Sequence, residues 1–218
     1  MPLSEKATSL HTGTLGDKTV VERLRRVEEC TASFLAFDRL LKLRTEHRCP
    51  DTVTSFYGEI ELASMAEVLQ GMHVDADSTV LDFGCGAGRW LIAAGMLGAR
   101  NAIGVEFVQE RADAARYATE GLGCLVFTGD GLDPSNGVWE HAPTHVVAYD
   151  LAFAENVRRD FWRRVRNVPS VRSVAVWHKA AVGSGTSISS PSCDFRLTKT
   201  LNTTSTTNEC FDCYVYTR

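Results

Sequence analysis

Short apolar strands alternate with amphipathic helices between residues 78 and 178, and this alternation constrains the fold more than any other feature of the chain. We expect strands at 79–84, 102–107, 124–130, 145–150 and 173–178, with helices at 88–97, 109–119 and 155–167. Strands that alternate with helices in this way form a parallel sheet that helices cover on both faces. The sequence therefore predicts an α/β domain.

The two ends of the chain differ from this pattern. Residues 195–202 and 209–217 are β-rich and flank a threonine-rich turn, which predicts an antiparallel hairpin that completes a seven-stranded, mostly parallel sheet. Apolar residues recur at helical spacing from 17 to 47, before Pro50, and a short helix is expected at 60–72. We therefore expect a helical extension at 1–50 and the main domain at 51–218.

Composition narrows the class of protein. The 218 residues are 44% hydrophobic, enough for one α/β domain and a small accessory piece. A formal net charge of −4 does not favour a nucleic-acid binder as a whole, and no apolar run is long enough for a membrane span. Seven cysteines, an odd number, suit buried thiols in a reducing, intracellular compartment. Cys210 and Cys213 fall on opposite faces of an expected strand, so we predict no metal site there.

A glycine-rich loop follows the first strand of the alternating region. In "VLDFGCGAGRW", Gly84, Gly86 and Gly88 lie between an apolar strand and a helix, where missing Cβ atoms let backbone amides approach a ligand. A dinucleotide fingerprint would need glycine where Arg89 stands, so the D-x-G-x-G-x-G spacing, headed by Asp82, argues against a nicotinamide enzyme.

Acidic residues end the next two strands. Glu106, followed by Phe107, is placed to accept hydrogen bonds from both ribose hydroxyls of an adenosine-type cofactor. Asp130, followed by Gly131, ends the third strand, where an acceptor could meet the adenine amino group. An Asp in such a turn is also commonly structural.

The block from about 78 to 217 resembles the class I S-adenosylmethionine-dependent methyltransferases, which have a Rossmann-like fold. The resemblance implies S-adenosylmethionine as cofactor and S-adenosylhomocysteine as product. It also implies that Asp82 orients the loop and the ammonium of the methionine moiety.

The end of the fourth strand should face the methyl acceptor. In "AYDLAF", Asp150 offers polarity, and Tyr149 and Phe153 offer aromatic walls. Many amino-group methyltransferases carry D/N-P-P-Y/F here, whereas this chain has Leu151 and Ala152 in place of the prolines. That difference counts against a nucleic-acid adenine methyltransferase.

Two linked motifs resemble the disruptor of telomeric silencing (DOT) family of non-SET histone lysine methyltransferases over about residues 54–217. "YGE" at 57–59 matches a family loop that covers the methionine end of the cofactor, and residues 149–153 match the family's Asn-Asn-Phe-Ala-Phe motif. The resemblance implies cofactor contacts for Tyr57, Gly58 and Glu59, and an acceptor channel built from Tyr57, Asp150, Phe153 and Tyr214. The chain differs from the family where Asp150 replaces Asn, Ile60 replaces Thr and Arg89 replaces Gln.

The same resemblance implies a nuclear enzyme that methylates a lysine in the globular core of histone H3 within nucleosomes. A lysine that enters a dry channel beside a sulfonium would lose its proton more easily, because burial and like charge both disfavour the ammonium. The arginine-rich helix at 158–166 could contact nucleosomal DNA, although a solvated helix surface explains it equally well.

Three other functions stay open at this stage. The chain could methylate a non-histone protein or a small amine, or it could be a catalytically silent module that binds the cofactor. A nicotinamide oxidoreductase comes last, because the glycine spacing does not suit it.

Overall fold

Seven strands form one mixed sheet in a computed structural model that describes residues 59–180 and 195–218. The strand order is β3-β2-β1-β4-β5-β7-β6. The strands are β1 (Thr79–Phe83), β2 (Asn101–Glu106), β3 (Leu125–Thr128), β4 (His145–Ala148), β5 (Ser173–Val176), β6 (Arg196–Thr204) and β7 (Cys210–Thr217). β1 to β5 are parallel, whereas β7 runs antiparallel to both β5 and β6. The predicted α/β fold with a closing antiparallel hairpin is confirmed.

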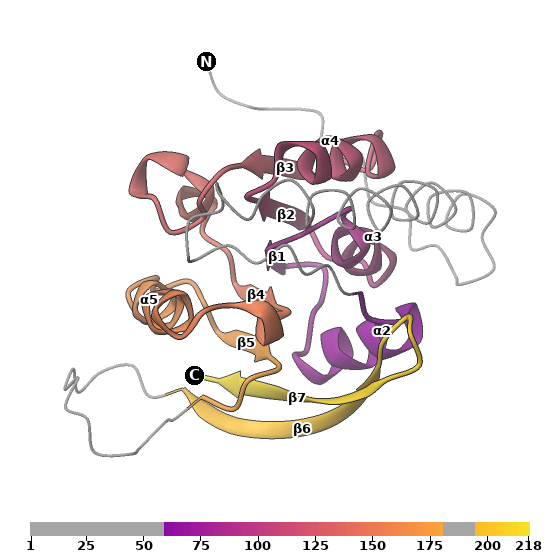
Figure 1. Ribbon diagram of the computed structural model, residues 1–218, viewed down its shortest axis with the longest axis vertical. Coiled ribbons are helices and arrows are strands. Elements are labelled where there is room, and N and C mark those ends of the chain that lie inside the picture. Colours follow the sequence, from indigo (N-terminus) through magenta and orange to yellow (C-terminus); the bar gives the residue numbers. More distant parts are fainter. Residues whose placement is uncertain (1–58, 181–194) are drawn as a thin grey trace, which may run out of the picture.

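Helices cover both faces of the sheet. α2 (Leu62–Gly71), α3 (Arg89–Met96) and α4 (Gln109–Ala118) lie on one face, and α5 (Glu155–Arg166) lies on the other (Figure 1). Short 3-10 helices at Pro134–Asn136, Val138–His141 and Asp150–Ala152 occupy the connections that flank β4. Because both faces are covered, every residue of β1, β4 and β5 is buried.

The strand order reverses between β1 and β4. β1 pairs with β2 on one side and with β4 on the other. The chain from β1 to β4 first forms β2 and β3 on one side of β1 and then crosses to the other side. In open α/β sheets, ligands bind in the crevice outside the carboxyl ends of the strands at such a switch point. The topology alone therefore places the ligand site above the ends of β1, β2 and β4.

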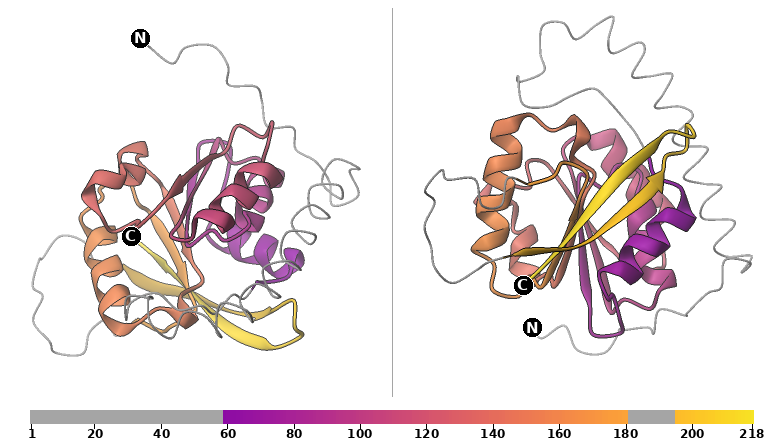
Figure 2. Two further views of the ribbon diagram at one scale, coloured as in Figure 1. Left: turned by 45° about the horizontal axis from the view of Figure 1, so that its top comes forward. Right: turned by 90° about the horizontal axis from the view of Figure 1, so that it is seen from below.

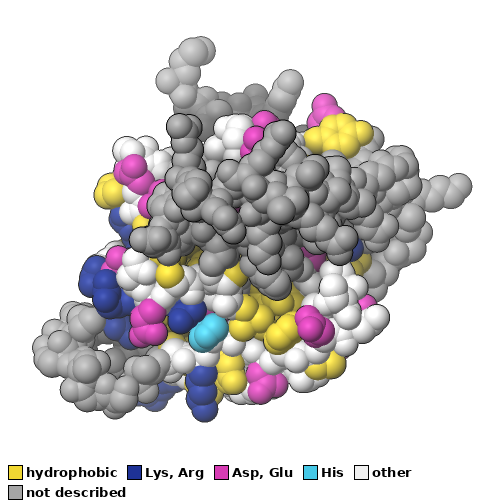
Figure 3. Space-filling model, viewed as in Figure 1, with side chains coloured by type: hydrophobic (Ala, Val, Ile, Leu, Met, Phe, Trp, Pro, Cys, Tyr) yellow, Lys and Arg dark blue, Asp and Glu magenta, His cyan; other side chains and the backbone are white. Residues whose placement is uncertain are grey.

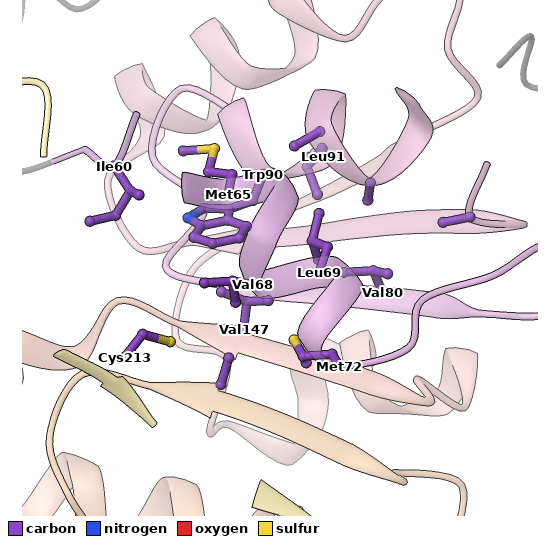
Figure 4. Packing of buried hydrophobic residues seen from close by; sticks show 14 of the residues in the cluster. Ile60, Met65, Val68, Leu69, Met72, Val80, Trp90, Leu91, Val147 and Cys213 are labelled. Atoms are coloured by element: carbon purple, nitrogen blue, oxygen red, sulfur yellow. The ribbon is translucent and has the colours of Figure 1, made fainter. Parts of the chain in front are cut away.

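α2 and the β6–β7 hairpin pack together at one edge of the molecule. Met65, Val68, Leu69 and Met72 point from α2 toward the sheet, where they meet Val80, Val147 and Cys213 among others (Figure 4). The hairpin runs past α2 as a long twisted ribbon (Figure 2). At the predicted helix end, Gly71 leaves room for β6, since a Cβ there would lie 3.0 Å from Leu201 Cδ1.

β6 is longer than predicted. Thr203 and Thr204, expected in the turn, belong to the strand, and the reversal is confined to the residues around Ser205–Asn208. Thr203 is fully buried; its hydroxyl donates to Phe211 O at 2.8 Å and accepts from Trp177 Nε1 at 2.9 Å. These long-range contacts override the turn signal of the threonine run.

Two expectations fall outside the described residues. They are the helical extension at 1–50 and the positions of Tyr57 and Gly58. Within the described ranges, no helix combines the length and apolar character needed to cross a bilayer.

Candidate functional site

A cavity of about 350 Å³ opens at the carboxyl ends of the parallel strands, at the switch point. Its walls come from the glycine loop after β1, the ends of β2 and β3, the segment after β4, and the starts of α2 and α3. The residues from the sequence prediction that line it are Glu59, Gly84, Gly86, Glu106, Phe107, Asp130, Gly131 and Phe153.

The glycine loop is tied to β2. The amides of Gly84 and Cys85 both donate to Val105 O, at 2.8 and 3.0 Å. Gly84 and Gly86 line the cavity with φ of +88° and +50°, backbone conformations that side chains other than glycine rarely adopt. Gly88 has a different task, because a Cβ there would lie 3.3 Å from Ala115 Cα, so this glycine lets α3 pack closely on α4.

Glu106 is a buried carboxylate anchored at the centre of the site. Its Oε2 accepts from Gly86 N at 3.0 Å and its Oε1 accepts from Val108 N at 2.9 Å. A carboxylate has about four acceptor positions, so both oxygens keep capacity for a ligand diol. Phe107, which is 46% exposed, adds an apolar wall beside it.

Asp130 and Gly131 form the wall of the cavity beyond Glu106. Asp130 Oδ1 accepts from Leu132 N at 2.8 Å, which fixes the turn after β3. Gly131 packs so tightly that a Cβ would lie 2.6 Å from the Phe83 ring, and its carbonyl accepts from Trp139 Nε1 at 2.7 Å. The backbone of this wall is therefore held in place from two sides.

Asp82 lies at the end of β1 but is not among the described residues that line the cavity. It is 1% exposed, and its Oδ2 has no hydrogen-bond partner within the described part of the chain. Burial, followed by the negative charge of Glu106, raises the pKa of Asp82 well above its usual range. The structure thus places Asp82 beside the glycine loop, below the described cavity wall.

In the segment after β4, the residues that line the cavity differ from those that the sequence predicted. Tyr149, Leu151, Ala152 and Phe153 line the cavity, whereas Asp150 is buried and does not. Asp150 Oδ1 accepts from the amides of Trp177 and His178 at 2.7 and 2.8 Å, so it joins β4 to the end of β5. Burial raises the pKa of its carboxyl, although the two amides oppose the shift. The expected placement of Asp150 on the acceptor side of the cavity is corrected, because its neighbour Tyr149 lines the cavity and Asp150 does not.

Tyr214 also lies outside the described cavity wall. It pairs with Val176 across β5 and β7 and packs on the α5 side of the sheet, with Lys179 Nζ 6.0 Å from its ring centre. Of the four expected catalytic residues, the structure therefore brings only Phe153 to the cavity wall; Tyr57 lies outside the described residues.

Several lining residues were missed in the sequence. Arg89 and Trp90, at the start of α3, follow the last glycine of the loop, and Met65 comes from α2. Arg89 Nη1 lies 2.8 Å from Glu59 Oε2. Only Arg89 carried a signal, as a charged residue directly after the glycine triplet; the contributions of Met65 and Trp90 depend on tertiary packing.

Cys210 is exposed and Cys213 is buried, so the two cysteines of the C-x-x-C motif lie on opposite faces of β7, as expected for a strand. Among residues 59–180 and 195–218, no three His, Cys, Asp or Glu side chains gather as a metal site would require.

The chemistry of the cavity fits an adenosine sulfonium cofactor. The loop of positive-φ glycines leaves space that Cβ atoms would fill, and Glu106 offers an anchored diol acceptor. Aromatic and aliphatic residues complete the walls, which suits both a purine ring and an alkyl acceptor.

Comparison with known proteins agrees with this geometry. Residues 43–125 match the family described as histone methylation protein DOT1. That range includes Tyr57 to Glu59, the glycine loop and Glu106. A ribosomal protein L11 methyltransferase from Dechloromonas aromatica is 33% identical over 79 residues, which span 36% of this chain and 27% of that protein. The chain thus matches about a quarter of the length of this curated relative.

Two solved structures share the fold. An RNA methyltransferase from Salinibacter ruber, in complex with S-adenosyl-L-homocysteine, superposes with a TM-score of 0.52 at 17% identity, covering 71% of this chain and 90% of that one. TrmN from Thermus thermophilus gives a TM-score of 0.55 at 18% identity, covering 71% of this chain and 48% of that one. The fold is that of the class I S-adenosylmethionine-dependent methyltransferases, and the matches support S-adenosylmethionine as the cofactor.

The position of Glu106 predicts a loss of cofactor affinity on Glu106→Gln. The amide would place an NH2 group against the Gly86 or Val108 amide and lose one ribose acceptor. We expect S-adenosylhomocysteine binding, measured by calorimetry, to weaken about 10- to 100-fold, the scale of one hydrogen bond to a charged group. Glu110→Gln, on the exposed side of α4, is the matched control and should bind like wild type. Unchanged affinity in Glu106→Gln would contradict the ribose assignment.

The position of Asp150 predicts that it acts through structure. Asp150→Ala leaves two amides without their acceptor, so the free energy of unfolding in urea should fall by about 1–3 kcal/mol or more. Asp150→Asn keeps an acceptor oxygen in place, so it should retain most of the stability and the same pH dependence of turnover. A shifted pH profile in Asp150→Asn would show that its charge reaches the acceptor after all.

Proposed function

We propose that this chain is an S-adenosylmethionine-dependent protein lysine methyltransferase whose acceptor is a lysine in the globular core of nucleosomal histone H3. One observation carries the proposal: the match to the histone methylation family covers the Tyr-Gly-Glu motif, the glycine loop and Glu106 together. The segment 149–153 aligns with the second DOT motif in the sequence and shares Ala152 and Phe153 with it.

The acceptor side of the cavity is aromatic. The Phe153 ring packs closely over Gly84, since a Cβ on that glycine would lie only 3.3 Å from the ring. The ring also packs edge-on against Phe83, with ring centroids 5.9 Å apart. Tyr149 packs edge-on against Trp177, with centroids 5.0 Å apart. Such walls would exclude water from a lysine side chain while they contact its methylene groups.

When bound, S-adenosylmethionine supplies an electrophilic methyl group on a sulfonium. The aromatic walls would remove water around the entering lysine, which lowers the pKa of its ammonium from about 10.4 and frees its lone pair. Burial, followed by the charge of Glu209, raises the pKa of Tyr149 to about 12. Tyr149 therefore stays protonated at neutral pH, and its hydroxyl can orient the amine through a hydrogen bond.

A basic surface on α5 supports nucleosome binding. Lys and Arg side chains gather over this part of the molecule, at the left of Figure 3. Arg159 and Arg163 have side chains that are 57% and 55% exposed, although both contact Asp160. Arg158 and Arg164 are used internally, since they donate to Phe153 O and Leu132 O. The outward arginines could contact DNA phosphates in the nucleus, with an affinity that falls as salt rises.

The curated relative supports a second candidate, the methylation of a protein other than a histone. That relative is named for ribosomal protein L11, and the matching 79 residues are 33% identical. Both candidates share the cofactor and differ in the surface that presents the acceptor.

A methyl-transfer assay distinguishes the two. Radiolabelled S-adenosylmethionine is incubated with the full chain and, in parallel, recombinant nucleosomes, free histone H3 and ribosomal protein L11, and labelled products are mapped by mass spectrometry. The proposal predicts label on a core lysine of H3, at a higher level in nucleosomes than in free histone. Label on L11 alone would support the second candidate, and no label on any of the three would contradict both.

The orienting role of Tyr149 has its own test. Tyr149→Phe keeps the aromatic wall and removes one neutral hydrogen bond, so kcat should fall about 3- to 10-fold, while affinity for S-adenosylhomocysteine stays unchanged. Tyr117→Phe, on the exposed side of α4, is the control. An equal kcat in wild type and Tyr149→Phe would contradict the orienting role of the hydroxyl and would mean that Tyr149 contributes only its ring to the cavity wall.

A further inference from the structure

Trp177, directly after β5, is buried behind the cavity wall. Its ring packs edge-on against two aromatic side chains that do line the cavity: Tyr149, with ring centroids 5.0 Å apart, and Trp90, with ring centroids 5.7 Å apart. Trp177 itself is 4% exposed and is not among the described residues of the wall. It therefore connects two rings that a ligand would meet, without meeting the ligand itself.

Two hydrogen bonds leave the Trp177 residue little freedom to move. Its backbone amide donates to Asp150 Oδ1 at 2.7 Å, and its indole Nε1 donates to Thr203 Oγ1 at 2.9 Å. The Thr203 hydroxyl accepts this bond while it donates to Phe211 O at 2.8 Å, so its own orientation is fixed as well. The main chain and the ring of Trp177 are thus held by two different parts of the fold.

The indole bond connects the cavity wall to the β6–β7 hairpin. Thr203, in β6, is fully buried. Phe211, in β7, packs its ring edge-on against Tyr149, with ring centroids 6.4 Å apart. The hairpin therefore reaches Tyr149 twice, directly through Phe211 and indirectly through Thr203 and Trp177. A leucine or phenylalanine could occupy this core position without an acceptor for an N–H, so packing alone does not explain an indole here.

We propose that Trp177, fixed by its bond to Thr203, is a positioning residue for methyl transfer that holds the rings of Tyr149 and Trp90 at the cavity. An in-line transfer depends on alignment, and a displacement of about 1 Å can lower its rate about 100-fold. Trp177 acts through the two rings and touches neither the cofactor nor the acceptor. The inference rests on the methyl transfer of the proposed function and is independent of which protein carries the acceptor.

Matched substitutions of two buried tryptophans test the effect on turnover in the full chain. Trp177→Leu removes the ring and its N–H. Trp162→Leu, the control, removes a tryptophan that is 8% exposed and packs on Tyr216, away from the described cavity wall. With recombinant nucleosomes as acceptor, we expect kcat to be about 10- to 100-fold lower in Trp177→Leu than in Trp162→Leu. The affinity for S-adenosylhomocysteine, measured by calorimetry, should be the same in the two variants.

NMR of the tyrosine rings provides a second readout that needs no acceptor. The chain has five tyrosines, and the signal of Tyr149 is the one that Tyr149→Phe removes. Thr203→Val keeps every aromatic ring and removes only the acceptor of the indole N–H, so a shift of the Tyr149 signal would report a change in ring position. Thr198→Val is the control, because its hydroxyl also donates from β6 to a β7 carbonyl, at 3.2 Å. We expect the Tyr149 signal to shift in Thr203→Val and to stay in place in Thr198→Val.

Three results would overturn the proposal. One is an unmoved Tyr149 signal in Thr203→Val, which decides the inference even if Trp177→Leu does not fold. Another is an equal kcat in Trp177→Leu and Trp162→Leu. The third is a loss of S-adenosylhomocysteine affinity in Trp177→Leu as large as its loss of kcat, which would mean that Trp177 only holds the site together. If wild type labelled no acceptor, the proposed function would fail, whereas the Tyr149 signal would still decide this inference.

Discussion

The attachment of the glycine loop to β2 is the interaction on which the site depends. Gly84 and Cys85 donate to Val105 O, and Gly86 donates to the Glu106 carboxylate. These bonds fold the chain sharply after β1 and leave the loop amides and the carboxylate facing one cavity. Gly104 on β2 permits the contact, since a Cβ there would lie 2.6 Å from Cys85 Sγ. One local arrangement therefore determines both the shape of the cavity and the position of the Glu106 carboxylate in its wall.

The hairpin that closes the sheet has a second role at the site. Its tip bonds to the backbone of residues 59–61, through Thr206 N to Glu59 O and Glu61 N to Thr204 O, and thereby holds Glu59 against Arg89. The turn before β7 thus positions the side chain of Glu59, which lies twenty residues before β1 in the sequence. The sheet edge and the cavity are connected through these backbone hydrogen bonds. Substitutions in the hairpin turn should therefore change ligand affinity.

The sequence was sufficient to predict the fold and to place Glu106 and Asp130 at the cavity. Alternating apolar strands and helices predicted the parallel sheet, and Glu106 and Asp130 could be placed because the carboxyl ends of parallel strands meet at one edge. The residues of the segment after β4 that face the cavity were harder to predict from the sequence. Whether Tyr149 or Asp150 faces the cavity depends on a 3-10 turn and on two amides after β5, neither of which the local sequence reveals. Arg89 was visible as a charge after the glycines, but its partner Glu59 is brought to it by tertiary structure.

The central claim is that one cavity holds S-adenosylmethionine with its methyl group toward Tyr149 and Phe153. A crystal structure of the complete chain with S-adenosylhomocysteine tests it most directly. The account predicts the ribose at Glu106 and the sulfur directed at the aromatic wall formed by Tyr149 and Phe153, with Tyr57 on the same side. A sulfur that faces away from this wall, or rings of Tyr57 and Phe153 on opposite sides of the molecule, would contradict it.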